Sequence, residues 1–313
     1  MDISCAIGGK KLPSLIMNAS GPLCTMEDHL RALCQSSSGA VVTKSMTIEP
    51  RDGNPHPKYA DLEYGSVNSN GLENLGVGRY MEVISKLKKE FPDCVFIASV
   101  AGLKEEDYYN MAAEIGTVAD LIEVNLSCPN IPGKPQIAYD MEASDRILKT
   151  INTKTQAPIG VKLPAYCDPV FLKEAADMLM KHELAYLSLI NSIGHTVHVD
   201  PLTDETVIHP NNGRGGLGGA YIKPIALGQV HAFYQLLGNR IPILGVGGVY
   251  TGRDVYDYVL AGATGVQVGT AYMQEGPAIF TRIAQELRNV LAEKGARSAQ
   301  EKLGMLKIRG VNT

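Results

Sequence analysis

The sequence predicts an α/β protein that folds as a (β/α)₈ TIM barrel with inserted loops after strands two and six. The first observation behind this prediction is that eight short apolar runs alternate with eight helix-like segments, a pattern that produces a parallel sheet covered by helices. The second is the length of 313 residues, which is ordinary for one barrel with insertions. The third is that no Gly-x-Gly-x-x-Gly motif follows the first apolar run, as the competing doubly wound fold would require.

The predicted strands are apolar runs bounded by polar or glycine-rich residues, which is typical of strands that are buried on both faces. They cover Leu15–Ala19, Ala40–Lys44, Val95–Val100, Leu121–Leu126, Ile159–Leu163, Tyr186–Asn191, Ile241–Val246 and Gly265–Val268.

The predicted helices alternate with these strands and carry apolar residues at helical spacing. In the last of them, Ile279, Ile283 and Leu287 share one face. The helices cover Met26–Gln35, Tyr80–Phe91, Glu105–Ile115, Ser144–Thr153, Val170–His182, Pro224–Leu237, Gly252–Leu260 and Pro277–Lys294.

Two intervals are too long to be simple connections between a strand and a helix. Arg51–Arg79 follows strand two, and Ser192–Tyr221 follows strand six. Loops of this length in a compact domain are usually functional or carry small added strands. Because the chain shows no internal repeat, low-complexity tract or linker, we expect one domain that spans residues 1–313.

The composition argues against several classes of function. A formal net charge of -4 with scattered Lys and Arg does not favour nucleic acid as a partner. No apolar stretch is long enough to span a bilayer, and the N-terminus does not resemble a secretory signal. Six cysteines without a Cys-x-x-Cys pair, and no His-Glu-x-x-His, give no basis for a disulfide scaffold or a metal site. We therefore expect a cytoplasmic protein without a metal.

Ligands of such barrels bind at the carboxyl ends of the strands, so the residues at these ends predict the site. The ends carry two lysines, several amides, one cysteine and two glycine turns, but no cluster of carboxylates. Gly247-Gly248 and Gly269-Thr270 follow the last two strands, where backbone N–H groups of barrels bind phosphate. One such turn would indicate only a tight connection; two turns at these strands favour a phosphate ligand.

Lys44 and Lys162 lie at the ends of the second and fifth predicted strands. A single lysine in such a place usually extends its ammonium group into solvent. Two lysines that face amides instead indicate an anionic or electron-rich ligand, such as a flavin whose ring gains negative charge on reduction.

Cys128 differs from the other cysteines in its surroundings. It follows a strand in the polar segment Asn125–Asn130 and precedes a rigid proline, where a thiol could act as a nucleophile or as a base. No histidine is close in sequence, but a Cys–His pair that forms only in the folded chain stays open. Most cysteines are small core residues, and we interpret Cys5, Cys34, Cys94 and Cys167 in this way.

These motifs resemble those of the dihydroorotate dehydrogenases. The most specific is Asn-Leu-Ser-Cys-Pro-Asn at 125–130, followed by Ile-Pro-Gly-Lys-Pro-Gln. Family-like motifs also occur in order at 51–55, 68–72 and 215–219. The chain looks like the soluble, homodimeric class 1A, which reduces fumarate. The membrane-bound relatives carry an N-terminal extension and a serine base, and the NAD-linked relatives have another tail after the cysteine loop.

The resemblance implies an FMN cofactor and the oxidation of dihydroorotate to orotate in pyrimidine (UMP) biosynthesis, with fumarate reduced to succinate. Cys128 would remove the C5 proton while hydride leaves C6 for the flavin. The residues implied in substrate binding are Lys44, Asn68, Asn70, Gly71, Leu72, Asn125, Asn130, Asn191 and Ser192. Those implied in FMN binding are Ala19, Ser20, Lys44, Ser45, Asn125, Lys162, Ile190, Gly219, Gly247, Gly248, Gly269 and Thr270.

Several positions near the implied substrate site depart from the family pattern. The family usually has methionine in place of Asn70 and proline in place of Glu73, and Asn-Gly in place of His195-Thr196. It also usually has Pro and Phe where this chain has Ala165 and Cys167. Two alternatives therefore stay open: a related flavin oxidoreductase that acts on another dihydropyrimidine or enoate, and a barrel that binds a phosphate ligand without redox chemistry.

Overall fold

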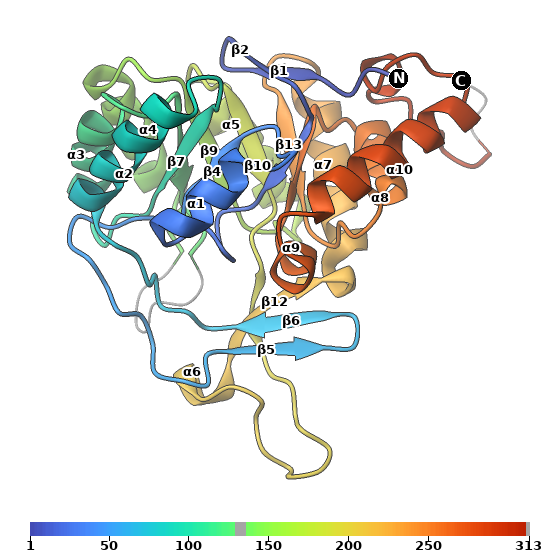
Figure 1. Ribbon diagram of the computed structural model, residues 1–313. Helices are drawn as coiled ribbons and strands as arrows, with labels where there is room; N and C mark the ends of the chain where they lie inside the picture. The colour runs from blue at the N-terminus through green and yellow to red at the C-terminus, as the bar shows by residue number, and fades with distance from the viewer. Residues whose placement is uncertain (129–135, 311–313) are drawn as a thin grey trace.

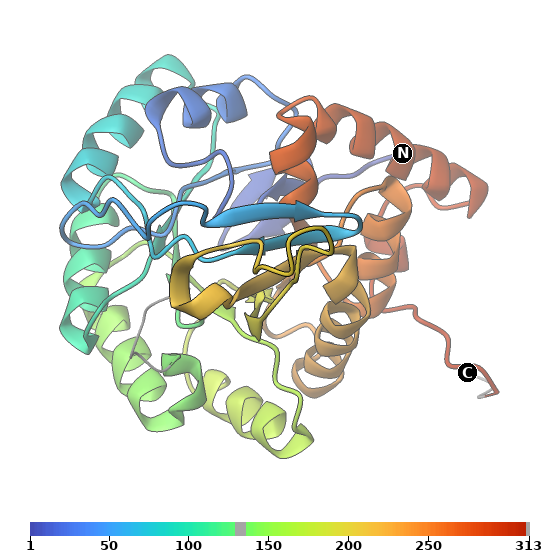
Figure 2. The ribbon, with the colours of Figure 1, turned by 90° about the horizontal axis from the view of Figure 1, so that it is seen from below.

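The structure is a computed structural model that describes residues 1–128 and 136–310. Its centre is a sheet of eight parallel strands, surrounded by helices (Figures 1 and 2). The strand order is β3-β14-β13-β10-β9-β8-β7-β4, as expected for a barrel. Each strand overlaps one of the eight predicted runs, which confirms the fold class. Their bounds are β3 (Ile16–Asn18), β4 (Val41–Val42), β7 (Phe96–Val100), β8 (Leu121–Asn125), β9 (Ile159–Leu163), β10 (Tyr186–Leu189), β13 (Ile243–Val246) and β14 (Gly265–Val268).

The barrel is completed between β3 and β4 by a side chain instead of a strand ladder. The carboxamide of Asn18 donates to the backbone oxygen of Val42 at 2.7 Å and accepts from its N–H at 2.8 Å. Nearby, the N–H of Gly39 donates to the oxygen of Ile16 at 2.8 Å. Asn18 therefore replaces a peptide group at the point where the first and last strands of the sheet meet.

The eight predicted helices are all present on the outside of the sheet (Figure 2). Two of them begin three residues before their predicted starts, because the caps lie further upstream. Gly76 (φ 79°) precedes α2, and the Asp140 carboxylate accepts from the N–H of Ala143 at the start of α4. The helices are α1 (Glu27–Cys34), α2 (Val77–Glu90), α3 (Glu105–Ile115), α4 (Met141–Lys154), α5 (Pro169–Leu179), α7 (Lys223–Leu237), α8 (Gly252–Ala261) and α10 (Ile279–Glu293).

The two long insertions combine into one small antiparallel sheet. The first supplies β5 (Tyr59–Leu62) and β6 (Gly65–Asn68), and the second supplies β11 (Ile193–Thr196) and β12 (Gly215–Gly219). Their order is β11-β12-β6-β5, so a ladder between β12 and β6 joins the two insertions. This inserted sheet lies across one end of the barrel (Figures 1 and 2).

Several short elements were not predicted from the sequence. A hairpin of β1 (Cys5–Ile7) and β2 (Lys10–Leu12) lies at the end of the barrel opposite the inserted sheet (Figure 1). The others are the helices α6 (Pro210–Gly213) and α9 (Thr270–Glu275) and the 3₁₀ helices Ile137–Tyr139, Ala220–Ile222 and Gln300–Lys302. They are too short to produce a periodic pattern in the sequence.

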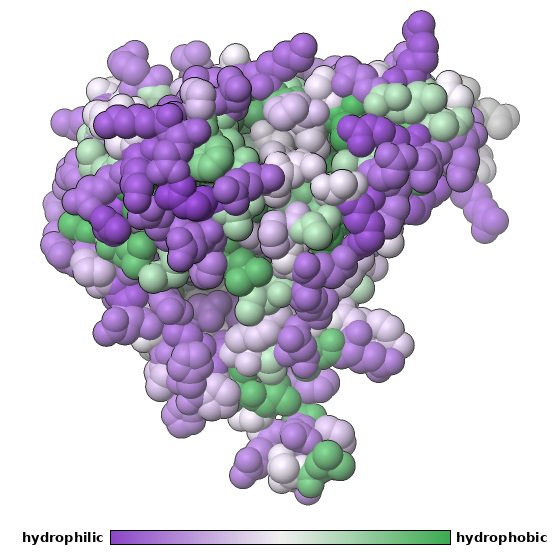
Figure 3. Space-filling view, in the orientation of Figure 1, coloured by the Kyte–Doolittle hydropathy of each residue, from purple (hydrophilic) through white to green (hydrophobic). Residues whose placement is uncertain are grey.

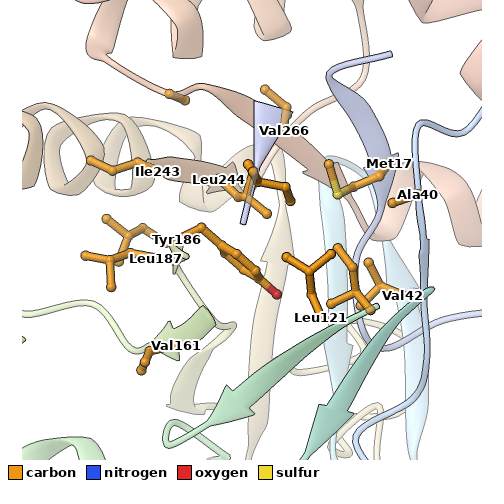
Figure 4. Close-up of a cluster of buried hydrophobic side chains, with 14 of the residues drawn as sticks. Met17, Ala40, Val42, Leu121, Val161, Tyr186, Leu187, Ile243, Leu244 and Val266 are labelled. Carbon is orange, nitrogen blue, oxygen red and sulfur yellow. The ribbon is translucent and has the colours of Figure 1, made fainter. Parts of the chain in front are cut away.

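The barrel interior towards the amino ends of the strands is filled by side chains and is not a channel. Figure 4 shows Met17, Leu121, Tyr186 and Leu244 gathered in this buried cluster. Gly160 leaves the room that the Tyr186 ring occupies, because a Cβ at residue 160 would lie 2.2 Å from a ring atom. Ligands of such packed barrels bind at the carboxyl ends of the strands.

Between the apolar layer and the carboxyl ends of the strands the interior becomes polar. Glu123 of β8 accepts a hydrogen bond from the side-chain amide of Gln267 of β14 at 2.9 Å, although these strands are not neighbours. The two side chains therefore meet across the barrel interior. Ser188 donates to the same Gln267 side chain at 3.0 Å, which extends the polar layer towards the carboxyl ends of the strands.

Candidate active site

A cavity of about 440 Å³ lies at the carboxyl ends of the barrel strands, next to the inserted sheet. Its volume falls within the usual range for small-molecule and cofactor sites. All predicted site residues that the structure describes line it; Asn130 lies outside the described residues. They are Ala19, Ser20, Lys44, Ser45, Asn68, Asn70, Gly71, Leu72, Asn125, Cys128, Lys162, Ile190, Asn191, Ser192, Gly219, Gly247, Gly248, Gly269 and Thr270.

Two buried lysines that belong to the barrel strands or follow them line the cavity. Lys44 follows β4 and is 9% exposed, and Lys162 in β9 is 3% exposed. The Lys44 ammonium donates to the backbone oxygen of Gly21 at 3.1 Å. Burial lowers the pKa of Lys44, while the nearby Cys24, Glu73 and Cys128 side chains act in the opposite direction. A buried lysine with few partners is suited to bind an anion, which would replace the lost hydration.

Three hydrogen bonds hold the side-chain amide of Asn125, the last residue of β8, in one orientation. Its nitrogen donates to the Ser45 hydroxyl at 3.0 Å, and its oxygen accepts from both the N–H and the hydroxyl of Ser127 at 3.1 Å. The amide of Asn191 donates to the backbone oxygen of Ser127 at 2.9 Å. These bonds fix two amides next to Cys128 before any ligand binds, which reduces the cost of ordering them on binding.

The segment after β6 offers backbone donors. Gly71 (φ 71°) and Leu72 (φ 57°) are both left-handed. The backbone oxygen of Asn70 accepts from the N–H of Asn54 at 3.0 Å, and that of Gly71 accepts from Arg51 at 3.3 Å. Because the N–H and C=O of a trans peptide point in opposite directions, the N–H groups of Gly71 and Leu72 face away from the Arg51–Asn54 loop. Consecutive backbone N–H groups in a turn can form a concave anion site.

Glycines form another wall of the cavity, and a Cβ added to two of them would collide with neighbouring atoms. A Cβ at Gly248 (φ 65°) would lie 2.5 Å from the Cβ of Lys223 and 3.0 Å from the oxygen of Gly219. A Cβ at Gly219 (φ 82°) would lie 2.3 Å from the Cα of Gly65. Gly219, Gly247 and Gly248 line the cavity at the end of β12 and after β13, and bare backbone of this kind suits a phosphate group.

Cys128 completes the cavity at the end of β8. It is half-buried and lines the cavity together with both lysines. Its thiol lies close enough to Lys44 and to Tyr108 to influence the pKa of each side chain. A thiol beside a fixed ammonium group is favoured as thiolate, the form that acts as a base.

Comparisons with known proteins identify the family. The family model of dihydroorotate dehydrogenase matches residues 3–291. A Lactococcus lactis subsp. cremoris protein named "Dihydroorotate dehydrogenase A (fumarate)" is 44% identical over 308 residues, which cover 97% of this chain and 99% of that protein. The chain belongs to the dihydroorotate dehydrogenase family. A protein of Streptococcus uberis is 46% identical over 303 residues, or 96% of each chain.

Solved dihydroorotate dehydrogenases share the fold at much lower identity. The Eimeria tenella enzyme in complex with ferulenol superimposes with a TM-score of 0.85 at 21% identity, covering 97% of this chain and 88% of that one. Dihydroorotate dehydrogenases are flavin-dependent oxidoreductases. The bare glycines and the two buried ammonium groups are compatible with the phosphate and the electron-rich ring of a flavin nucleotide.

Some residues of this dihydroorotate dehydrogenase cavity were not predicted. Ser66 of β6 hydrogen-bonds to Thr270 at 3.0 Å and so links the inserted sheet to a predicted cofactor residue. His29 and His56 also line the cavity, whereas His195, one of the departures from the family pattern, is not among the lining residues. No sequence signal distinguishes Ser66 or His29, because they reach the cavity only through the inserted sheet and the packing of α1.

Glu73, one of the departures from the dihydroorotate dehydrogenase pattern, has a definite place. Its carboxylate forms an ion pair with the buried Lys58 at 2.7 Å, and both residues line the cavity.

Among the described residues, no group of three His, Cys, Asp or Glu side chains could hold a metal ion. None of the described helices is both long and apolar enough to cross a bilayer.

Proposed function

We propose that this chain binds FMN, oxidises (S)-dihydroorotate to orotate in pyrimidine (UMP) biosynthesis, and passes the electrons to fumarate, which becomes succinate. The observation that carries the proposal is a single cavity that holds the Cys128 thiol, two buried ammonium groups and a glycine wall. The full-length relatives named for the fumarate-linked enzyme support the choice of substrate and acceptor.

The residues divide into two proposed groups. Asn68, Asn125, Asn191 and Ser192 would hydrogen-bond the pyrimidine ring, and the N–H groups of Gly71 and Leu72 would bind the substrate carboxylate. Asn70 would contribute its backbone, so that the change from methionine leaves this contact in place. FMN would be held by Ala19, Ser20, Lys44, Ser45, Asn125, Lys162, Ile190, Gly219, Gly247, Gly248, Gly269 and Thr270.

In the proposed reaction, the Cys128 thiolate accepts the proton from C5 of dihydroorotate and becomes a thiol. When bound, FMN supplies the acceptor for the hydride that leaves C6. The Lys44 ammonium lies close enough to Cys128 to favour the thiolate before the proton is transferred. The fixed Asn125 and Asn191 amides orient the substrate so that both departing hydrogens face their acceptors.

We also propose that the protein is a homodimer. The connection between β11 and β12 projects from the barrel (Figure 1) and carries apolar surface, seen in green at the bottom of Figure 3. Leu202 in this connection is 92% exposed. Val197 and Val199 in the same connection are also exposed, and several exposed apolar side chains on one projecting segment favour a protein contact.

Anaerobic reduction of the purified protein by dihydroorotate tests the proposed function. We expect a yellow protein whose visible flavin absorbance bleaches on adding dihydroorotate and returns on adding fumarate.

A yellow protein that dihydroorotate does not bleach would point to the second candidate, a flavin oxidoreductase for another dihydropyrimidine or enoate. The ion pair of Glu73 with Lys58 favours that candidate, because it adds a carboxylate where the family usually has proline. A colourless protein that binds no FMN would indicate a barrel without redox chemistry.

A further inference from the structure

Cys34 and Cys94 come from distant parts of the chain and lie together on the outside of the barrel. Cys34 is the last residue of α1, and Cys94 precedes β7 by two residues. The Cys94 thiol donates to the backbone oxygen of Cys34 at 3.6 Å, and the two thiols lie close enough that each alters the pKa of the other. Both are half-buried. The interpretation of these residues as separate core cysteines therefore misses their contact.

The backbone around the two thiols is held in place on both sides. The N–H of Cys94 donates to the oxygen of Phe91 at 3.1 Å, and the oxygen of Val95 accepts from the N–H of Val41 at 2.9 Å. On the side of α1, Glu27 forms an ion pair with Lys86 of α2 at 2.7 Å. Because the Cys94 sulfur already lies 3.6 Å from the backbone oxygen of Cys34, a disulfide between the two residues would need little movement of either segment.

The contact between the two thiols makes them chemically unequal. The Cys34 thiol lowers the pKa of Cys94, and the Cys94 thiol raises the pKa of Cys34. The Cys94 sulfur is consequently the one that carries thiolate character and reacts first with an oxidant. Cys34, already in contact with it, is placed to attack the oxidised sulfur.

We propose that Cys34 and Cys94 form a reversible disulfide when the protein meets hydrogen peroxide. The Cys94 thiolate attacks the peroxide, forming a sulfenic acid and releasing hydroxide. The Cys34 sulfur then attacks the Cys94 sulfur, the S–OH bond breaks, and water leaves. Two thiols and one peroxide thus give one disulfide and two waters, and a small dithiol reverses the change. The site is independent of the proposed oxidation of dihydroorotate, because neither residue lines the cavity.

The disulfide would join the end of α1 to the start of β7 and close a loop of about 60 residues. The first turn of α1 carries His29, which lines the cavity, so the bond would also fix the position of one cavity wall. Because a disulfide restricts the unfolded chain, we expect the melting temperature of the oxidised protein to rise by about 4 °C or more.

Mass spectrometry of the full-length protein tests the proposal, using the Cys128→Ala variant so that the cavity thiol does not react. After treatment with peroxide, we expect the intact mass to fall by the mass of two hydrogen atoms. Trypsin digestion without reductant should then yield a peptide in which Ala32–Lys44 is joined to Glu90–Lys104, and dithiothreitol should separate the two.

Two single variants and one control make the test specific. Cys34→Ser should stop at a sulfenic acid on Cys94 that dimedone traps, whereas Cys94→Ser should leave Cys34 largely unmodified. Cys167→Ser, which removes an exposed thiol, should form the joined peptide as before. If peroxide modifies the protein without producing the joined peptide, or if Cys34 reacts as readily without Cys94, the proposal is wrong.

Discussion

The side-chain amide of Asn18 makes hydrogen bonds to both backbone groups of Val42, at 2.7 Å and 2.8 Å, in the gap where β3 and β4 meet. Asn18 is fully buried. One side chain thus supplies the hydrogen bonds that a longer β4 would have made, and the closure of the barrel depends on it.

Replacing Asn18 with alanine should therefore destabilise the barrel. The change leaves a buried N–H and a buried C=O of Val42 without partners, at a cost of about 1–3 kcal/mol for each. We expect the melting temperature, measured by circular dichroism, to fall by about 4 °C or more. Asn289→Ala, in an exposed part of α10, serves as the control and should change it by about 1 °C at most. Equal effects of the two variants would show that Asn18 does not contribute to closure.

The Cys128→Ala variant tests the proposed base. FMN should stay bound with an unchanged spectrum, because the thiol is proposed to contact the substrate and not the cofactor. We expect turnover with dihydroorotate to fall by about 10²–10⁴-fold, the usual contribution of a general base. Cys167→Ala, at an exposed position, is the matched control. Turnover within a factor of about two of the original protein would remove Cys128 from this role.

Two glycine variants separate the phosphate site from general effects of adding a methyl group. In Gly248→Ala the new Cβ would lie 2.5 Å from the Cβ of Lys223, and the φ of 65° is strained for any residue with a side chain. The backbone must therefore shift, and we expect FMN affinity to fall at least tenfold, or about 1.4 kcal/mol. In Gly228→Ala the methyl group meets nothing within 4 Å and should stabilise α7 by up to about 1 kcal/mol. Flavin fluorescence on dilution measures both affinities, and unaltered FMN binding by Gly248→Ala would contradict the proposed site.

The sequence was sufficient to predict the eight strands because each is a buried apolar run. It was also sufficient to predict that Lys44, Cys128 and Gly248 line one cavity, because a barrel brings all strand ends together. The role of Asn18 could not be predicted, since it depends on the shortness of β4. The link from Ser66 to Thr270 depends on the pairing of β6 with β12, which joins insertions far apart in sequence. Such contacts are set by tertiary structure and leave no local pattern.

Glu73→Gln tests whether the additional carboxylate opposes an anionic substrate. Glutamine keeps the size of the side chain but removes a negative charge from the cavity that holds Lys44 and Lys58. We expect KM for dihydroorotate to fall by about two- to tenfold with little change in kcat, since up to about 1.4 kcal/mol of repulsion is removed. Glu82→Gln, on the exposed face of α2, should leave KM unaltered. A KM that rises in Glu73→Gln would show that the carboxylate assists binding.

Lys44 should make the binding of orotate depend on pH. Burial holds the pKa of its ammonium below the ordinary 10.5. As the pH rises, Lys44 therefore loses its charge at a lower pH than an exposed lysine does. The neutral amine attracts the carboxylate of orotate less, and the Kd should rise by up to about tenfold per pH unit above that pKa. Arginine keeps its charge throughout this range; Lys44→Arg should therefore lack this part of the pH dependence while keeping any that comes from orotate itself. Flavin difference spectra between about pH 7 and 10 measure both Kd values, and parallel pH profiles for the two proteins would exclude Lys44 as the titrating group.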